Sequence, residues 1–146
     1  MKNIFLEIPN KTDDYLCLID GSSHTIWAFL MDLSEGDHNA MCAVLSKKEF
    51  KNLPDLNTWA QKSFEDENEP PIQETHGSKD YFKGNIQESD FEVEWGKDGI
   101  SAIIKVKGSV QALLSFATKK GYTKAIKKTG MWGLPWSEDE FQKIRK

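Results

Sequence analysis

The sequence predicts an α+β fold: a mostly antiparallel sheet of five or six strands with two to four helices packed on one face. Three observations predict this class. Short apolar runs separated by polar, glycine-containing turns recur along the chain. Several segments begin with the capping signal of a helix. The 146 residues match the commonest size of one domain, so we expect a single domain over 1–146.

The first part of the chain is predicted to form strands. Apolar runs at 3–8, 15–19, 24–33 and 40–45 are each bounded by polar residues. The second and third runs flank a short turn around Gly21, which is typical of a β-hairpin because glycine adopts positive φ without a steric penalty.

A helix is predicted to begin at Ser46, because Ser46 and Glu49 have the spacing of a capping box. The apolar residues that follow recur at helical spacing: Leu56, Trp59, Ala60 and Phe64. Residues 65–84 contain few aliphatic side chains, and we expect them to form a long acidic and polar loop.

The clearest hairpin is predicted over 91–107, with its turn at 96–99. Its first strand alternates apolar residues with glutamates. The alternation places two sets of side chains on opposite faces, with Phe91, Val93 and Trp95 toward the core and Glu92 and Glu94 toward solvent.

Ser109 is predicted to cap a helix over 110–120 that ends at Gly121. Residues 122–128 are compatible with either a strand or a second short helix.

A final helix is predicted after Ser137, which has capping-box spacing with Glu140. Trp136 and Phe141 occupy the two positions of a hydrophobic staple, so we expect this helix to dock on the domain.

Cys17 and Cys42 lie in apolar runs, which predicts buried, reduced thiols and a reducing compartment. A disulfide between them stays open, because the sequence does not give their separation. The apolar run at the N-terminus is broken by Glu7 and Pro9 and is too short for a signal peptide. We therefore expect a cytoplasmic chain without a membrane span, although a mature chain that has lost a signal remains an alternative.

Catalytic and metal-binding patterns are weak. The histidines at 24, 38 and 76 fall in predicted turns or loops, and no CxxC or HExxH motif occurs. Asp20, Ser22 and His24 share one tight turn, where a catalytic triad cannot easily converge. No cofactor and no metal are predicted.

Charge is distributed unevenly, although the net charge is only −4. Residues 1–99 carry 20 acidic and 9 basic side chains, whereas residues 100–146 carry 3 acidic and 10 basic. Arg145 is the single arginine. Because arginine supplies most bidentate contacts to bases and phosphates, nucleic-acid binding through the lysine-rich last third is only a third hypothesis.

The first functional hypothesis is a small acidic protein-binding domain, such as an immunity or inhibitor protein that neutralises a basic toxin or nuclease. An acidic surface attracts a basic partner and raises its association rate. The predicted contact residues are Glu65, Asp66, Glu67, Glu69, Tyr81, Phe82, Glu92 and Glu94. The second hypothesis is a small enzyme or small-ligand-binding protein whose pocket is lined by Trp27, Trp132 and Trp136.

Overall fold

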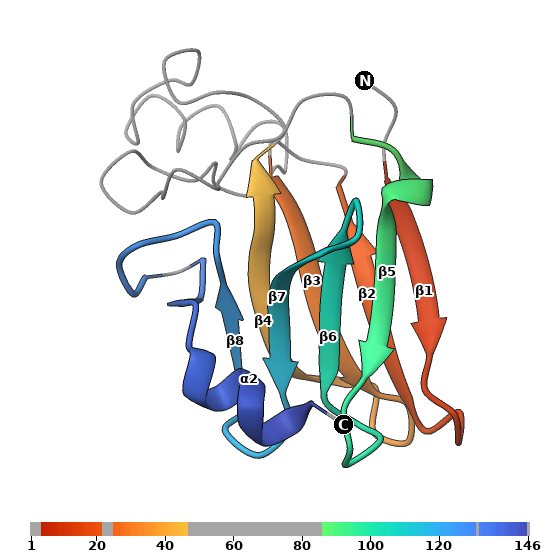
Figure 1. Cartoon of the computed structure of the whole chain (residues 1–146). Helices are drawn as coiled ribbons and strands as arrows, with labels where there is room; N and C mark the ends of the chain where they lie inside the picture. Colours follow the sequence, from red (N-terminus) through yellow and green to blue (C-terminus); the bar gives the residue numbers. More distant parts are fainter. Residues whose placement is uncertain (1–3, 22–24, 47–85, 131, 146) are drawn as a thin grey trace, which may run out of the picture.

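The computed structural model describes residues 4–21, 25–46, 86–130 and 132–145, which form two β-sheets that face each other (Figure 1). The first sheet has the order β1–β2–β3–β4, with the bounds Phe5–Pro9, Tyr15–Asp20, Thr25–Asp32 and Asp37–Ser46. The second sheet has the order β5–β6–β7–β8–β9, with the bounds Phe91–Trp95, Ala102–Val106, Ser109–Ser115, Lys120–Thr123 and Leu134–Pro135. Neighbouring strands are antiparallel except β8 and β9, which are parallel.

The predicted α+β class is wrong. Within the described ranges the chain forms two sheets and one α-helix, α2 (Glu138–Ile144), besides a single 3-10 turn at Glu88–Asp90. The predicted helix at 46–64 and the predicted loop at 65–84 lie outside the described residues, apart from Ser46 at the end of β4.

The predicted helix over 110–120 is wrong, because most of this segment forms β7 and the turn that follows it. Lys107 and Gly108 both have positive φ, 51° and 84°, as a two-residue hairpin turn requires, and Val106 pairs with Ser109 across it. The sequence pattern of this segment resembles that of a helix because five consecutive residues, Gln111 to Ser115, are buried on both faces of the strand. Periodicity cannot separate such a strand from a buried helix.

Other strand predictions are confirmed. The four apolar runs of the first part of the chain coincide with β1 to β4, and 91–107 contains the β5–β6 hairpin. The ambiguous segment 122–128 begins as the end of β8.

The main core fills the space between the two sheets. Strand alternation directs one set of side chains of each sheet inward, where they are almost completely buried. They include Ile19, Leu30 and Val44 from the first sheet and Ile104, Val106 and Leu114 from the second.

The hydrogen bonding at the ends of the strands holds the two layers together. The buried Asn10 side chain, in the β1–β2 turn, donates from Nδ2 to the Gly99 carbonyl oxygen at 2.9 Å, in the β5–β6 turn. Its Oδ1 accepts from the backbone amides of Asp14 and Tyr15, at 3.1 Å each. The Asn10 side chain therefore forms hydrogen bonds with backbone groups of both the β1–β2 turn and the β5–β6 turn.

The chain after β8 wraps around the edge of β4. Trp132 accepts a hydrogen bond of 2.8 Å at its carbonyl oxygen from the Ala43 amide. Gly121 and Gly133 lie against β4, and a Cβ at Gly121 would overlap the Met41 carbonyl oxygen. Glycine is required there because the two backbones approach too closely for any side chain.

Both cysteines are buried and free, as predicted. Cys17 lies on β2 and Cys42 on β4, with β3 between them. Because adjacent strands are about 4.8 Å apart, the two Cα atoms are separated by about 10 Å, beyond the reach of a disulfide. The disulfide that the sequence left open is therefore excluded in this fold.

Candidate interaction surfaces

The face of the first sheet that points away from the second sheet is apolar. Strand alternation that turns Cys17 and Ile19 inward turns Leu16 and Leu18 outward. Register places Leu16 beside Met31, and Leu18 beside Phe29, which in turn lies beside Met41. We call these five residues, Leu16, Leu18, Phe29, Met31 and Met41, the outer apolar face.

The outer apolar face is partly accessible. Met41 is 40% exposed, and Leu16, Leu18 and Met31 are half-buried. Phe29 is covered mainly by its neighbours, including the His38 ring, whose centroid lies 4.7 Å away. Phe5, which is 53% exposed, extends the apolar surface on β1.

When one face of an antiparallel sheet is in contact with solvent, the residues on that face are normally polar. The apolar residues on the outer face of the first sheet therefore require an explanation. At one end this face is covered by Ala125, Ile126 and Trp132. These residues form a cluster with Trp27, Ala43 and Phe29, and Leu18 and Met31 pack against that cluster. The second sheet differs from the first in that a helix, α2, covers its outer face through Phe141 and Ile144. None of the described helical residues covers the outer apolar face, and Met41 is its most accessible side chain. Accessible apolar surface is a common feature of interaction sites.

The border of the outer apolar face is acidic. Residues 4–21 and 25–46 contain one lysine, Lys11, and seven carboxylates: Glu7, Asp13, Asp14, Asp20, Asp32, Glu35 and Asp37. Glu7 shares the outward direction of Leu18, with which it is paired in register. The other end of the face is bordered by Asp32, Glu35 and Asp37 at the β3–β4 turn.

Hydrogen bonds to two of these carboxylates favour their ionised form. The Ser34 hydroxyl donates to Asp32 at 2.6 Å and the Ser34 amide donates at 2.9 Å, and these bonds lower the pKa of Asp32. The pKa of Asp14 is lowered in the same way by the Thr12 hydroxyl and then by the Asn10 amide. The acidic border therefore keeps its charge well below neutral pH.

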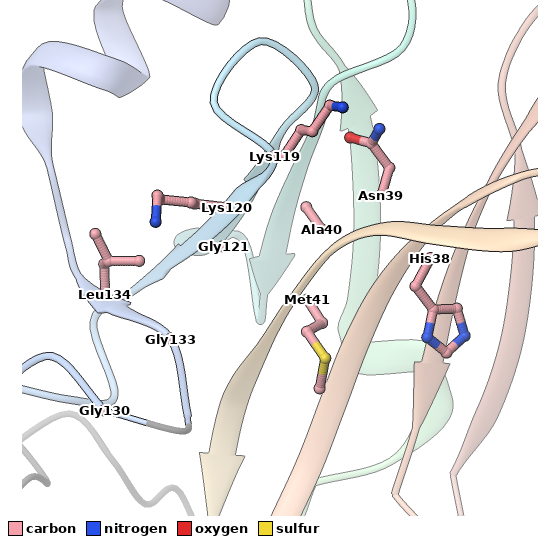
Figure 2. A pocket seen from close by; sticks show the side chains of 10 residues that line it. All are labelled: His38, Asn39, Ala40, Met41, Lys119, Lys120, Gly121, Gly130, Gly133 and Leu134. Atoms are coloured by element: carbon pink, nitrogen blue, oxygen red, sulfur yellow. The ribbon is translucent and has the colours of Figure 1, made fainter.

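A cleft of about 270 Å³ adjoins this face at the start of β4 (Figure 2). It lies between β4, the turn into β8 and the segment that leads to β9. Its described lining residues are His38, Asn39, Ala40, Met41, Lys119, Lys120, Gly121, Gly130, Gly133 and Leu134. His38 and Met41 belong to both the cleft and the outer side of the first sheet, so the two surfaces are continuous.

The predicted contact residues are divided between two situations. Glu92 and Glu94 lie together, exposed on β5, as the alternation predicted. They belong to the second sheet, and Lys105 lies 3.1 Å from Glu94 and 4.0 Å from Glu92. They are therefore partly neutralised and are not part of the outer apolar face. The remaining predicted contacts lie outside the described residues: Glu65, Asp66, Glu67, Glu69, Tyr81 and Phe82.

The three tryptophans of the predicted aromatic pocket do not share one cluster. Trp27 and Trp132 are buried together beneath the end of the outer apolar face. Trp136 packs instead on Phe141, with ring centroids 5.3 Å apart, and lies within 5.0 Å of the Lys124 amine.

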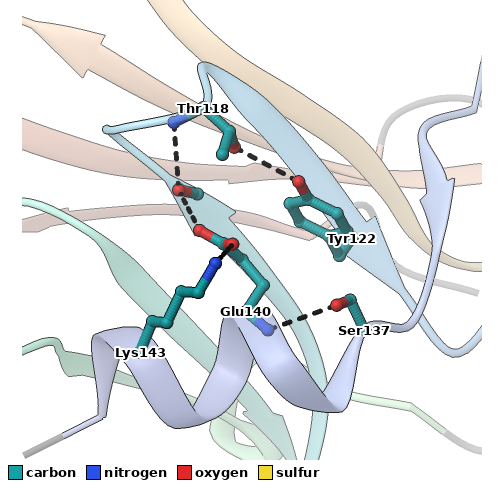
Figure 3. Close-up of polar contacts among 6 residues, drawn as sticks. Thr118, Tyr122, Ser137, Glu140 and Lys143 are labelled. Atoms are coloured by element: carbon teal, nitrogen blue, oxygen red, sulfur yellow. Dashed lines mark hydrogen bonds and ion pairs between the residues drawn. The ribbon is translucent and has the colours of Figure 1, made fainter.

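Glu140 is a buried carboxylate, and its contacts are those of a structural residue (Figure 3). The Ser115 hydroxyl donates to it at 2.9 Å, and the Lys143 amine lies 4.0 Å away. Ser115 Oγ also accepts from the Thr118 amide at 3.3 Å. These bonds attach α2 to the end of β7.

Sequence reasoning missed the outer apolar face, although a signal for it was present. The runs YLCLI and TIWAFLM are apolar at almost every position, whereas an antiparallel strand with one solvated face should alternate. Continuous runs of this kind indicate strands that are covered on both sides.

Comparison with protein-family models, with curated protein sequences and with solved structures finds no match for this chain. Among the described residues, no three histidine, cysteine or carboxylate side chains converge as a metal site would require. The described part of the chain also contains no helix of the length and apolarity needed to span a membrane.

Proposed function

We propose that this chain is a protein-binding domain that receives a basic protein on the outer apolar face. The observation that carries the proposal is the contiguous set of accessible apolar side chains within an acidic border. Exposed apolar patches with a polar rim are typical of protein–protein interfaces.

The two kinds of residue have different parts in binding. Leu16, Leu18, Met31 and Met41 supply apolar area that is desolvated on contact, which is where most binding energy arises. The seven carboxylates on 4–21 and 25–46 act over longer distances and raise the association rate of a positively charged partner.

An inhibitor or immunity protein that blocks a basic enzyme, such as a nuclease, is the particular form of this function that the charge distribution favours. Nucleic acid itself is disfavoured as the ligand of this face, because its phosphates would meet the carboxylates of the border. The small-ligand alternative from the sequence concerned a pocket lined by Trp27, Trp132 and Trp136, whereas the described lining of the neighbouring cleft contains no tryptophan.

The experiment compares three immobilised proteins as baits in extract of the native host: wild type, Leu16→Lys/Met41→Lys and the control Glu92→Lys/Glu94→Lys. We expect the wild type and the control to retain the same basic protein in stoichiometric amount, and the Leu16→Lys/Met41→Lys variant to lose it. Leu16 is half-buried and Met41 is 40% exposed, and matched thermal melts would establish that each variant is folded.

The captured protein is then purified and its association rate is measured at several salt concentrations. Because the Debye length falls from about 10 Å at 0.1 M salt to about 3 Å at 1 M, the association rate should decrease with salt. Equal binding of the partner by the Leu16→Lys/Met41→Lys variant and the wild type would refute the proposal.

A further inference from the structure

The cleft beside the outer apolar face carries a concentration of positive charge. Its described lining contains Lys119, Lys120 and His38 but no carboxylate (Figure 2). Within the part of the chain that the structure describes, neither lysine forms an ion pair. By contrast, Lys105 and Lys143 both lie within 4.0 Å of a glutamate. The two lysine charges at the cleft are therefore available to a ligand.

Both lysines line the cleft, although their side chains extend in different directions, Lys119 toward Asn39 (Figure 2). Consecutive side chains of an extended strand point to opposite faces, which would separate Lys119 from Lys120. Lys119 has a φ of 58°, in the left-handed region that residues other than glycine seldom adopt. This conformation at the start of β8 allows both side chains to line one cleft.

Glycines allow two walls of the cleft to lie directly against β4. A Cβ at Gly121 would overlap the Met41 carbonyl oxygen, and a Cβ at Gly133 would lie 2.8 Å from the Cβ of Cys42. Gly130 and Gly133, which both line the cleft, exchange two backbone hydrogen bonds of 3.1 and 3.2 Å. Glycine at positions 121 and 133 is therefore required by the close packing against β4.

An unsatisfied polar group lies at the same place. Asn39 is the additional residue of a β-bulge, because Leu30 pairs with Ala40 while Met31 pairs with His38. Its Oδ1 atom is buried and has no hydrogen-bond partner. The two ends of an amide side chain are assigned from their hydrogen bonds, and a half-turn about the last bond would present the Nδ2 donors instead. Buried polar atoms are normally hydrogen-bonded, and a ligand in the cleft would supply the missing partner of this Asn39 atom.

We propose that this cleft binds a small organic anion, with its phosphate or carboxylate held by Lys119, Lys120 and the Asn39 amide. Leu134 and Met41 add an apolar side to the cleft, so the ligand carries a short apolar group beside its charge. A cleft of about 270 Å³ is slightly smaller than the pockets that accept drug-sized molecules, which limits the ligand to a small one.

The test is titration of the protein with hexyl phosphate, hexanoate and inorganic phosphate, followed by calorimetry and by backbone amide shifts. We expect saturable binding with one site, and shifts confined to 38–41, 119–121 and 130–134. Hexyl phosphate should bind more tightly than inorganic phosphate by about tenfold or more, because its alkyl group is removed from water. Comparison of hexyl phosphate with hexanoate decides between a phosphate and a carboxylate as the preferred charge.

Lys119→Ala/Lys120→Ala is the test variant and Lys127→Ala/Lys128→Ala the matched control, since Lys127 and Lys128 are exposed and do not line the cleft. Loss of two charged hydrogen bonds should weaken hexyl phosphate binding by about tenfold or more, with no change in the control. Asn39→Asp, which keeps the size of the side chain, should also weaken binding because it adds a negative charge.

Equal affinity of the test variant and the control, or no saturable binding of either hexyl anion to the wild type, would overturn the proposal. Affinity that increases with the length of a single-stranded oligonucleotide and depends on Lys127 and Lys128 as much as on Lys119 and Lys120 would also overturn it. In that case the lysines form an extended electrostatic surface for nucleic acid rather than a defined cleft.

Discussion

Ser115 on β7 donates a hydrogen bond of 2.9 Å to the buried carboxylate of Glu140 on α2. The two residues are 25 positions apart, and this bond joins the C-terminal helix to the second sheet, as does the 2.8 Å bond from the Lys97 amide to the Ile144 carbonyl oxygen. Replacement of Ser115 by alanine should destabilise the protein by about 1–3 kcal/mol, because it leaves a buried carboxylate without its hydroxyl partner. Urea unfolding measures the change. Ser109→Ala, at the exposed start of β7, is the matched control and should have little effect.

The cap of α2 gives a second prediction. Ser137 Oγ accepts from the Glu140 amide at 3.2 Å, as the capping spacing predicted. Ser137→Ala should lower the free energy of unfolding by about 1 kcal/mol, because that amide loses its partner. Ser137→Asp retains an acceptor at the cap and should restore stability. An alanine variant as stable as the wild type would show that the cap contributes nothing.

The buried thiols predict a pH dependence of stability. Burial raises the pKa of Cys17 to about 12 and raises the pKa of Cys42 as well. In the unfolded chain both thiols ionise near their ordinary pKa of about 8.5–9, so above that pH the unfolded state binds fewer protons than the folded state.

The free energy of unfolding should therefore be constant with respect to these thiols below pH 8. It should decrease between pH 9 and 10 by up to about 1.4 kcal/mol per pH unit for each thiol. Urea unfolding at pH 7, 8, 9 and 10 tests this. Cys17→Ala is the control: it is less stable at every pH, but its stability should fall less steeply above pH 9. If the stability of the wild type and that of Cys17→Ala depend on pH with the same slope, the raised pKa of the Cys17 thiol in the folded protein is contradicted.

Gly121 gives a fourth prediction. The variant Gly121→Ala brings a Cβ into the Met41 carbonyl oxygen, so β8 must move away from β4. We expect destabilisation of about 1–3 kcal/mol, the usual range for an overpacked core position. Gly36→Asn, at an exposed turn with open space around it and a φ of 74°, is the control, because asparagine tolerates that conformation. A Gly121→Ala melting temperature equal to that of the control would contradict the close approach.

Features carried by neighbouring residues were predictable from the sequence. Alternation of Phe91 to Trp95 predicted the β5 strand and its exposed glutamates. The Ser137 cap and the Trp136–Phe141 contact of α2 follow from spacings of three and five residues. These signals are local, because they arise from backbone groups and side chains within one turn or one strand.

Tertiary structure decided the fold class and the candidate sites. The segment Ser109–Ser115 satisfies the local rules for a helix and becomes a strand because β6 and β8 pair with it on both sides. The outer apolar face depends on the pairing of β2, β3 and β4, and the cleft brings Asn39 together with Lys119 across 80 positions of sequence. The sequence by itself determined which short segments are extended and where α2 begins. Which segments meet is a matter of long-range packing: it depends on the burial that a strand gains from its partners, and no single segment encodes that burial.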